Sequence, residues 1–133
     1  SQTLTKKARE NKNVILAGYL SGARLWELYA HAGLFLLPSY YEGLPLALLE
    51  AMSYGVSCLA SDIPANKELG LSEERYFKAW DVGTLIRKIK EFIDKPMPQE
   101  ERDAQAGRIL ESYHWDKVAD ETRCVYEKVL EAK

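Results

Sequence analysis

Uninterrupted apolar runs recur along the first 80 residues of the chain. Residues 34–37 (LFLL) and 56–60 (VSCLA) contain no charged side chain, and residues 13–18 and 76–77 are further candidates. Short apolar runs of this kind are typical of strands that are buried on both faces of a parallel sheet. The pattern therefore predicts buried strands at these four places.

Helical periodicity and strong helix formers fill the segments between the predicted strands. Leu25, Leu28 and Tyr29 recur at the i, i+3, i+4 spacing within residues 24–32, and Ser21 is the predicted N-cap of that helix. Asp81 is the predicted N-cap of an amphipathic helix over residues 82–93. The other predicted helices cover residues 3–11, 45–54, 64–68, 99–113 and 116–132.

Strands that alternate with helices predict parallel β-α-β units. Such units build an α/β layer architecture with helices flanking a parallel sheet. Ligands of these folds bind at the carboxyl ends of the strands, so candidate site residues are sought directly after the predicted strands.

Composition indicates one globular domain and argues against two classes of partner. The 133 residues are 47% hydrophobic and 29% charged, with a net charge of -2. Basic residues are scattered along the predicted helices, so no nucleic-acid surface is expected. No apolar stretch approaches the roughly 20 residues that cross a bilayer, and no signal peptide is recognised.

The cysteines and histidines show no spacing typical of a metal site. Cys58 and Cys124 lie far apart, in a predicted strand and a predicted helix, which favours two reduced thiols in a cytoplasmic protein. His31 and His114 have no ligand-spaced neighbours, so each is interpreted as structural and no metal is expected.

The turn between the strand at residues 34–37 and the next helix is the strongest candidate site. Glu42 and Gly43 lie in the loop, and Pro45 suits the first position of the helix. A strand-loop-helix corner directs free N–H groups and the positive end of the helix dipole at one point, which suits a phosphate. Glu50 is the only charged residue between Gly43 and Asp62. From the residues alone, an ordinary loop acid at Glu42 and a solvent-facing acid at Glu50 remain open.

The sequence PSYYEGLPLALLEAMSYG, from Pro38 to Gly55, followed by VSCLASD, resembles the E-x(7)-E signature of retaining family 4 glycosyltransferases. The similarity extends over residues 13–130. It implies the nucleotide-sugar-binding domain of the glycosyltransferase-B fold, with a Rossmann-like parallel sheet that is truncated at its N-terminus. It also implies transfer of a sugar from a nucleoside-diphosphate sugar with retention of configuration, and neither a metal nor another cofactor.

The resemblance assigns roles residue by residue. Glu42 matches the first glutamate, beside the donor sugar and the reacting centre, and Glu50 matches the second, which accepts hydrogen bonds from the ribose. Glu68 matches an acidic residue close to the donor, although Pro64 and Ala65 stand where many members have two glycines. The remaining implied donor contacts are Gly43, Leu44, Pro45 and Leu46 at the sugar and diphosphate, and Gly18, Tyr19 and Leu20 beside the base.

The same resemblance implies that residues 1–133 are the C-terminal donor-binding part of a longer enzyme. Members carry an upstream β-α unit with an Arg and a Lys for the diphosphate, and a separate acceptor domain, so this piece alone is expected to be inactive. The acceptor is not identified. The parent protein is expected to be cytoplasmic, with the inner face of a membrane as an alternative place.

In the family, the strands of the upstream unit lie between the strands that match residues 13–18 and 34–37. Without them, the predicted strand at residues 34–37 has an unpaired backbone edge, which favours pairing with another strand. We expect this strand to pair directly with residues 13–18, and a homodimer is the alternative.

Two other functions are weighed against transfer. A glycoside hydrolase also uses two carboxylates, but they flank the scissile bond at about 5–10 Å, and a phosphate-binding helix N-terminus would then serve no purpose. A non-catalytic nucleotide-sugar-binding or interaction module of the same fold remains open, because a fold alone does not fix a function.

Overall fold

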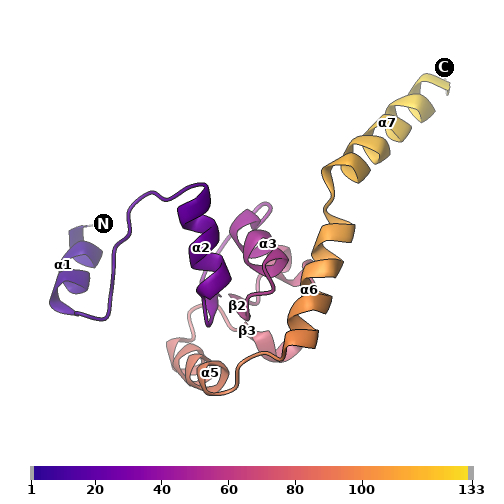
Figure 1. The fold of residues 1–133 in the computed structure, drawn as a ribbon. Coiled ribbons are helices and arrows are strands. Elements are labelled where there is room, and N and C mark those ends of the chain that lie inside the picture. The colour runs from indigo at the N-terminus through magenta and orange to yellow at the C-terminus, as the bar shows by residue number, and fades with distance from the viewer. Residues whose placement is uncertain (1, 132–133) are drawn as a thin grey trace.

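The computed structural model describes residues 2–131, and a three-stranded parallel sheet lies at its centre (Figure 1). The strands are β1 (Phe35–Leu37), β2 (Cys58–Ser61) and β3 (Tyr76–Phe77), and they lie in that order across the sheet. Leu36 is in register with Leu59, and Ala60 with Tyr76. The predicted α/β class with a parallel sheet and flanking helices is confirmed.

Each predicted helix is present with its observed ends within one residue of the predicted ones, apart from residue 132, which lies outside the described residues. Figure 1 shows the first and last helices extending away from the sheet in opposite directions. The helices are α1 (Gln2–Glu10), α2 (Ala23–His31), α3 (Leu46–Ser53), α4 (Pro64–Lys67), α5 (Val82–Asp94), α6 (Gln99–Ser112) and α7 (Trp115–Glu131), with a 3-10 turn, η1 (Glu73–Arg75), before β3.

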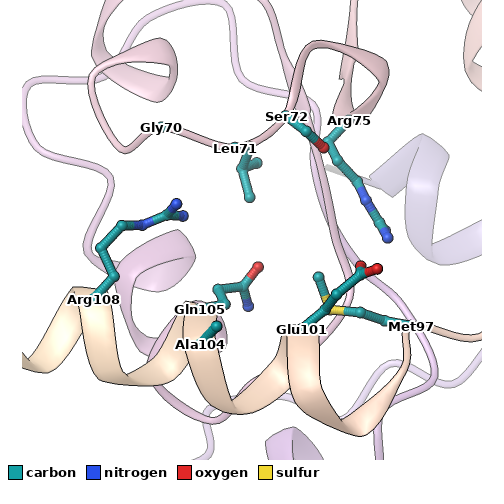
Figure 2. Close-up of a pocket in the computed structure, with 9 residues that line it drawn as sticks. All are labelled: Gly70, Leu71, Ser72, Arg75, Met97, Glu101, Ala104, Gln105 and Arg108. Atoms are coloured by element: carbon teal, nitrogen blue, oxygen red, sulfur yellow. The ribbon is translucent and has the colours of Figure 1, made fainter.

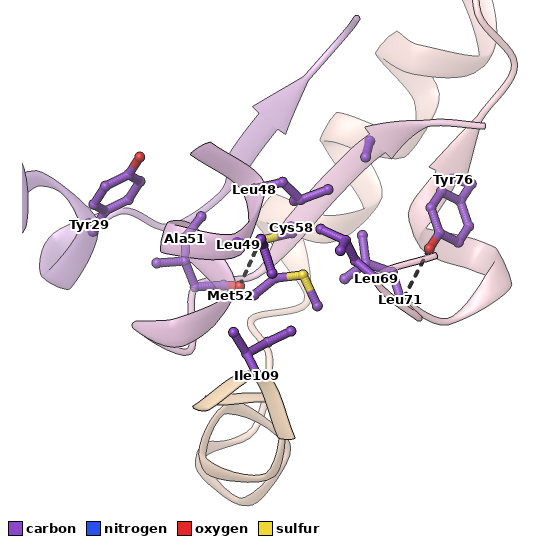
Figure 3. Close-up of a cluster of buried hydrophobic side chains, with 12 residues drawn as sticks. Tyr29, Leu48, Leu49, Ala51, Met52, Cys58, Leu69, Leu71, Tyr76 and Ile109 are labelled. Atoms are coloured by element: carbon purple, nitrogen blue, oxygen red, sulfur yellow. Dashed lines mark hydrogen bonds between the residues drawn. The ribbon is translucent and has the colours of Figure 1, made fainter. Parts of the chain in front are cut away.

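Helices cover both faces of the sheet, as a parallel sheet requires. Cys58 and Ala60 of β2 point to one face, where they join a buried cluster with side chains of α2, α3 and α6 (Figure 3). Leu59 points to the other face and packs with Phe77 and with Phe92 of α5. The uninterrupted apolar run of β2 is therefore explained, because both sets of alternating side chains are buried.

Helices α5 and α2 begin with different kinds of N-cap. Asp81 caps α5 as predicted, because its Oδ1 accepts a hydrogen bond from the Thr84 N–H at 2.9 Å. These bonds to Thr84 hold the pKa of the Asp81 carboxyl below its usual value. The predicted cap at Ser21 is wrong: the N-cap of α2 is Gly22, whose φ of 58° is a left-handed conformation that glycine adopts without strain.

The predicted strand at residues 13–18 is not formed. This segment runs in an irregular conformation from α1 to α2, and Ile15 is 86% exposed. No described strand pairs with the edge of β1 that faces away from β2, so the expected pairing between residues 13–18 and β1 is wrong as well. An apolar run becomes a buried strand only where a neighbour satisfies its backbone, and this segment has none among residues 2–131. The homodimer alternative stays a prediction.

The two cysteines should differ sharply in reactivity. Cys58 is fully buried in β2, and this burial raises the pKa of its thiol to about 12, whereas Cys124 is exposed on α7. Since the thiolate is the reactive form, we expect iodoacetamide at pH 8 to modify only Cys124 in the folded chain, and both residues in denaturant. Mass spectrometry of the peptides measures this, and equally fast modification of Cys58 in the folded chain would contradict its placement.

Candidate functional site

The loop between β1 and α3 lies at the carboxyl edge of the sheet and carries the predicted site. Glu42 is half-buried and Pro45 is buried, while Gly43, Leu44 and Leu46 are exposed. Helix α3 begins at Leu46, so Pro45 is its N-cap rather than its first residue. The sequence produces this corner because proline fixes φ just ahead of the strong helix formers LALLEAM.

Several backbone N–H groups at the start of α3 are free to bind a ligand. The Leu46 N–H donates to the Leu44 carbonyl at 2.8 Å, and Pro45 has no N–H to donate. The N–H groups of Gly43, Leu44 and Ala47 donate to no atom of residues 2–131. Together with the positive end of the helix dipole, these donors form an arrangement that suits an anion.

A serine holds the Glu42 carboxylate. Ser39 Oγ donates a hydrogen bond of 2.6 Å to Glu42 Oε1. Ser39 is itself held, because the Ser61 hydroxyl at the end of β2 donates to the Ser39 carbonyl oxygen. The orientation of Glu42 therefore depends on a strand that follows it in sequence.

A buried tyrosine holds the Glu50 carboxylate. The Tyr29 hydroxyl, from α2, donates to Glu50 Oε2 at 3.1 Å. The Tyr29 ring stacks on Tyr54, with centroids 5.6 Å apart, and is tilted against Phe35. Burial, together with the hydrogen bond to Glu50, raises the pKa of Tyr29 to about 12, so the hydroxyl stays a donor at neutral pH. Glu50 is therefore an exposed acid, and one oxygen of its carboxylate is held by Tyr29.

Contacts between the loops after the three strands hold the carboxyl edge together. Asp62, after β2, accepts a hydrogen bond from the Ala79 N–H, after β3, at 3.1 Å. Tyr40, after β1, stacks on Trp80, with ring centroids 3.6 Å apart and 15° between the planes. Trp80 has a φ of 75°, an unfavourable conformation for a bulky side chain, which the stack and the following cap help to hold.

The remaining predicted donor residues are not joined to this corner by any described hydrogen bond. Gly18, Tyr19 and Leu20 lie in the irregular segment before α2, and Tyr19 is 93% exposed. Glu68 is exposed and caps the C-terminal end of α4. Among residues 2–131, no group of three His, Cys, Asp or Glu side chains gathers as metal ligands would. No described helix is long and apolar enough to cross a membrane.

Sequence reasoning missed the residues that hold the two glutamates. Tyr29 was predicted only as an apolar position of its helix, and Ser39 was given no role of its own within the motif. The available signal was the position of Ser39 and Ser61, each of which is a small polar residue at or just beyond the end of an apolar run.

A cavity of about 210 Å³ lies at the opposite, amino edge of the sheet, between residues 70–75 and α6 (Figure 2). The buried guanidinium of Arg75 lines it. Arg75 donates to the Ser57 hydroxyl, and its guanidinium carbon lies 4.1 Å from the centroid of the Phe92 ring. The guanidinium is therefore engaged by side chains of the protein interior. The cavity is therefore separate from the edge that carries Glu42.

Comparisons with known proteins agree on one family. The model of the family described as "Glycosyl transferases group 1" matches residues 1–119. The chain is 34% identical over 115 residues to the MMP alpha-(1->4)-mannosyltransferase of Mycolicibacterium hassiacum, covering 84% of this chain and 28% of that protein. It is 29% identical over 129 residues to an uncharacterized glycosyltransferase of Methanocaldococcus jannaschii, covering 89% of this chain and 31% of that protein.

A solved structure confirms the fold. Sucrose-phosphate synthase from Thermosynechococcus elongatus superimposes with a TM-score of 0.83 over 99% of this chain and 34% of that chain, at 21% sequence identity. The chain thus spans about a third of the length of these similar proteins.

Proposed function

The chain belongs to the group 1 glycosyl transferases, and we propose that it is the donor-binding part of a retaining enzyme with the glycosyltransferase-B fold. In this proposal residues 1–133 form one domain of a longer protein, and a nucleoside-diphosphate sugar binds at the carboxyl edge of the sheet. The observation that carries the proposal is the β1–α3 corner, where free N–H groups and two held carboxylates occur together.

The start of α3 is proposed to bind the diphosphate. The free N–H groups of Gly43, Leu44 and Ala47 can donate to phosphate oxygens, and the exposed Leu44 and Leu46 side chains border the same corner. Negative charge grows on the diphosphate as the bond to the sugar breaks. Fixed N–H donors that face this charge stabilise the transition state more than the ground state. This charge stabilisation uses the backbone alone, and we propose no metal or cofactor role.

The two glutamates are proposed to have different partners. Glu42 lies in the loop just before the free N–H groups, and its carboxylate is proposed to face the donor sugar. Glu50 lies further along α3, and Tyr29 occupies its Oε2. Its other oxygen remains available for a ribose hydroxyl, since a carboxylate only accepts hydrogen bonds. Gly18, Tyr19 and Leu20 beside the base, and Glu68 near the donor, stay predictions.

The full-length protein provides the test of the proposal. Incubation with a panel of nucleoside-diphosphate sugars and candidate acceptors should release the nucleoside diphosphate and give a product with the anomeric configuration of the donor, measured by NMR. Donor binding without release would favour a non-catalytic module. Cleavage of a glycoside without any nucleotide would favour a hydrolase.

Replacing Glu50 with Gln in the full-length protein should weaken donor binding. A hydrogen bond to a charged group contributes about 1.5–3 kcal/mol, so the KM for the donor should rise about 10- to 100-fold, with a smaller change in kcat. Glu111→Gln, at an exposed glutamate on α6, is the matched control and should leave both constants unchanged. An unchanged donor KM in Glu50→Gln would rule out the ribose contact.

A further inference from the structure

Hydrogen bonds that meet at Ser39, one on its backbone carbonyl and one from its hydroxyl, connect the interior of the protein to Glu42. Asn66 Nδ2, on α4, donates to the carbonyl oxygen and the hydroxyl oxygen of Ser61, at 2.9 and 3.1 Å. The Ser61 hydroxyl donates to the Ser39 carbonyl, and Ser39 Oγ donates to Glu42 Oε1 at 2.6 Å. The residues come from the loop after β1, the end of β2 and the helix after it, so these hydrogen bonds cross the carboxyl edge of the sheet.

The direction of these hydrogen bonds is fixed by chemistry. The amide nitrogen of Asn66 can only donate, so the Ser61 oxygen accepts from it and must give its single proton to the Ser39 carbonyl. That bond fixes the backbone of Ser39, from which the Ser39 hydroxyl reaches Glu42. Glu42 is the final acceptor, and an ionised carboxylate is the strongest acceptor that could stand there.

The inner residues of this set are sealed from solvent. Ser61 and Asn66 are both 0% exposed, whereas Ser39 and Glu42 are half-buried. Asn66 Oδ1 is buried and has no hydrogen-bond partner in the described part of the chain. Buried side-chain oxygens usually have a hydrogen-bond partner, so the hydrogen bonds of the Asn66 side chain in the described residues are those that its Nδ2 donates to Ser61.

We propose that Ser39, Ser61 and Asn66 are positioning residues for Glu42 in the transfer reaction. They hold one carboxylate oxygen in place so that the other faces the donor sugar. The inference rests on the proposed function. It extends that function by assigning a role to three residues outside the two glutamates of the motif.

Ser61→Ala in the full-length protein tests the proposal directly. Loss of the hydroxyl frees the Ser39 carbonyl and should lower kcat about 10-fold, because small displacements of a catalytic group have effects of this order or larger. The donor KM should stay unchanged. Ser61→Thr keeps a hydroxyl and should retain most of the activity. Ser39→Ala removes the direct bond to Glu42 and should lower kcat at least as much as Ser61→Ala.

Ser57→Ala is the matched control. Ser57 is also buried and lies just before the same strand, β2, but its hydroxyl accepts from Arg75 at the opposite edge of the sheet. This variant should lose thermal stability to a degree similar to Ser61→Ala while keeping kcat. Equal losses of kcat in the two serine variants would overturn the proposal, because they would indicate a general structural effect.

A double variant separates failure of this inference from failure of the proposed function. In a Glu42→Gln background, Ser61→Ala should cause no further loss of kcat, because the group that it positions has lost its charge. A further 10-fold loss there would overturn the positioning role. If Glu42→Gln alone left kcat unchanged, the proposed role of Glu42 would fail, and the positioning role with it. If only Ser61→Ala were without effect, the positioning role alone would be wrong.

Discussion

Replacing Glu42 with Gln in the full-length protein should lower kcat for sugar transfer about 10²- to 10³-fold, the range measured when one preorganised electrostatic contact is removed from an active site. Positive charge develops on the sugar as it leaves the diphosphate, and the proposed position of Glu42 puts a negative charge beside it. Gln keeps the shape of Glu and can still accept the hydrogen bond from Ser39 Oγ, so the substitution removes the charge with little change in structure.

The measurement is steady-state release of nucleoside diphosphate, with donor binding followed by calorimetry on the same variants. Donor affinity should change little in Glu42→Gln, and Glu111→Gln should match the unmodified protein in both measurements. An unchanged kcat in Glu42→Gln would exclude the proposed catalytic role.

The contrast between Glu42 and Glu50 is the sharper part of this prediction. Glu42→Gln should act mainly on kcat, whereas Glu50→Gln should act mainly on the donor KM. The two carboxylates have different surroundings, because Ser39 holds Glu42 in the loop and Tyr29 holds Glu50 on the helix. Equal losses of donor affinity in the two variants would remove the division of roles.

The elements that depend on local chemistry were predictable from the sequence. Asp81 is followed by an amphipathic segment, and it caps α5 with the expected bond to Thr84. The segment at residues 13–18 is apolar and was predicted as a strand, but strand formation depends on a neighbouring strand as well as on the segment itself. Ile15 is exposed because the sheet of residues 2–131 provides no such neighbour.

The candidate site also has a part that the sequence predicts and a part that it does not. Glu42 and Glu50 could be found because their spacing within one loop and helix is a local pattern. The groups that hold them could not, because Tyr29 lies 21 positions before Glu50, and Ser61 lies 22 positions after Ser39. Contacts over such separations are set by the packing of α2, β1 and β2, which no short sequence pattern specifies.

The packing of α3 on the sheet determines the position of the proposed donor site. Truncation of Leu48 tests this packing. Leu48 is 0% exposed and lies in the buried cluster with Met52 and Cys58 (Figure 3), whereas Leu46, two positions earlier in α3, is 58% exposed. Truncating a buried leucine removes its transfer free energy and leaves a cavity that neighbouring side chains fill only in part.

Leu48→Ala should therefore lower the free energy of unfolding by about 2–5 kcal/mol. Leu46→Ala makes the same chemical change at an exposed position of the same helix and should cost no more than about 0.5 kcal/mol. Urea denaturation of the two variants, with equal slopes, measures the difference. A large loss in Leu48→Ala with a small one in Leu46→Ala would show that the Leu48 face of α3 packs on the sheet and that the Leu46 face is open to solvent. Similar losses in both variants would contradict this orientation of α3, and with it the exposed N–H groups on which the donor site depends.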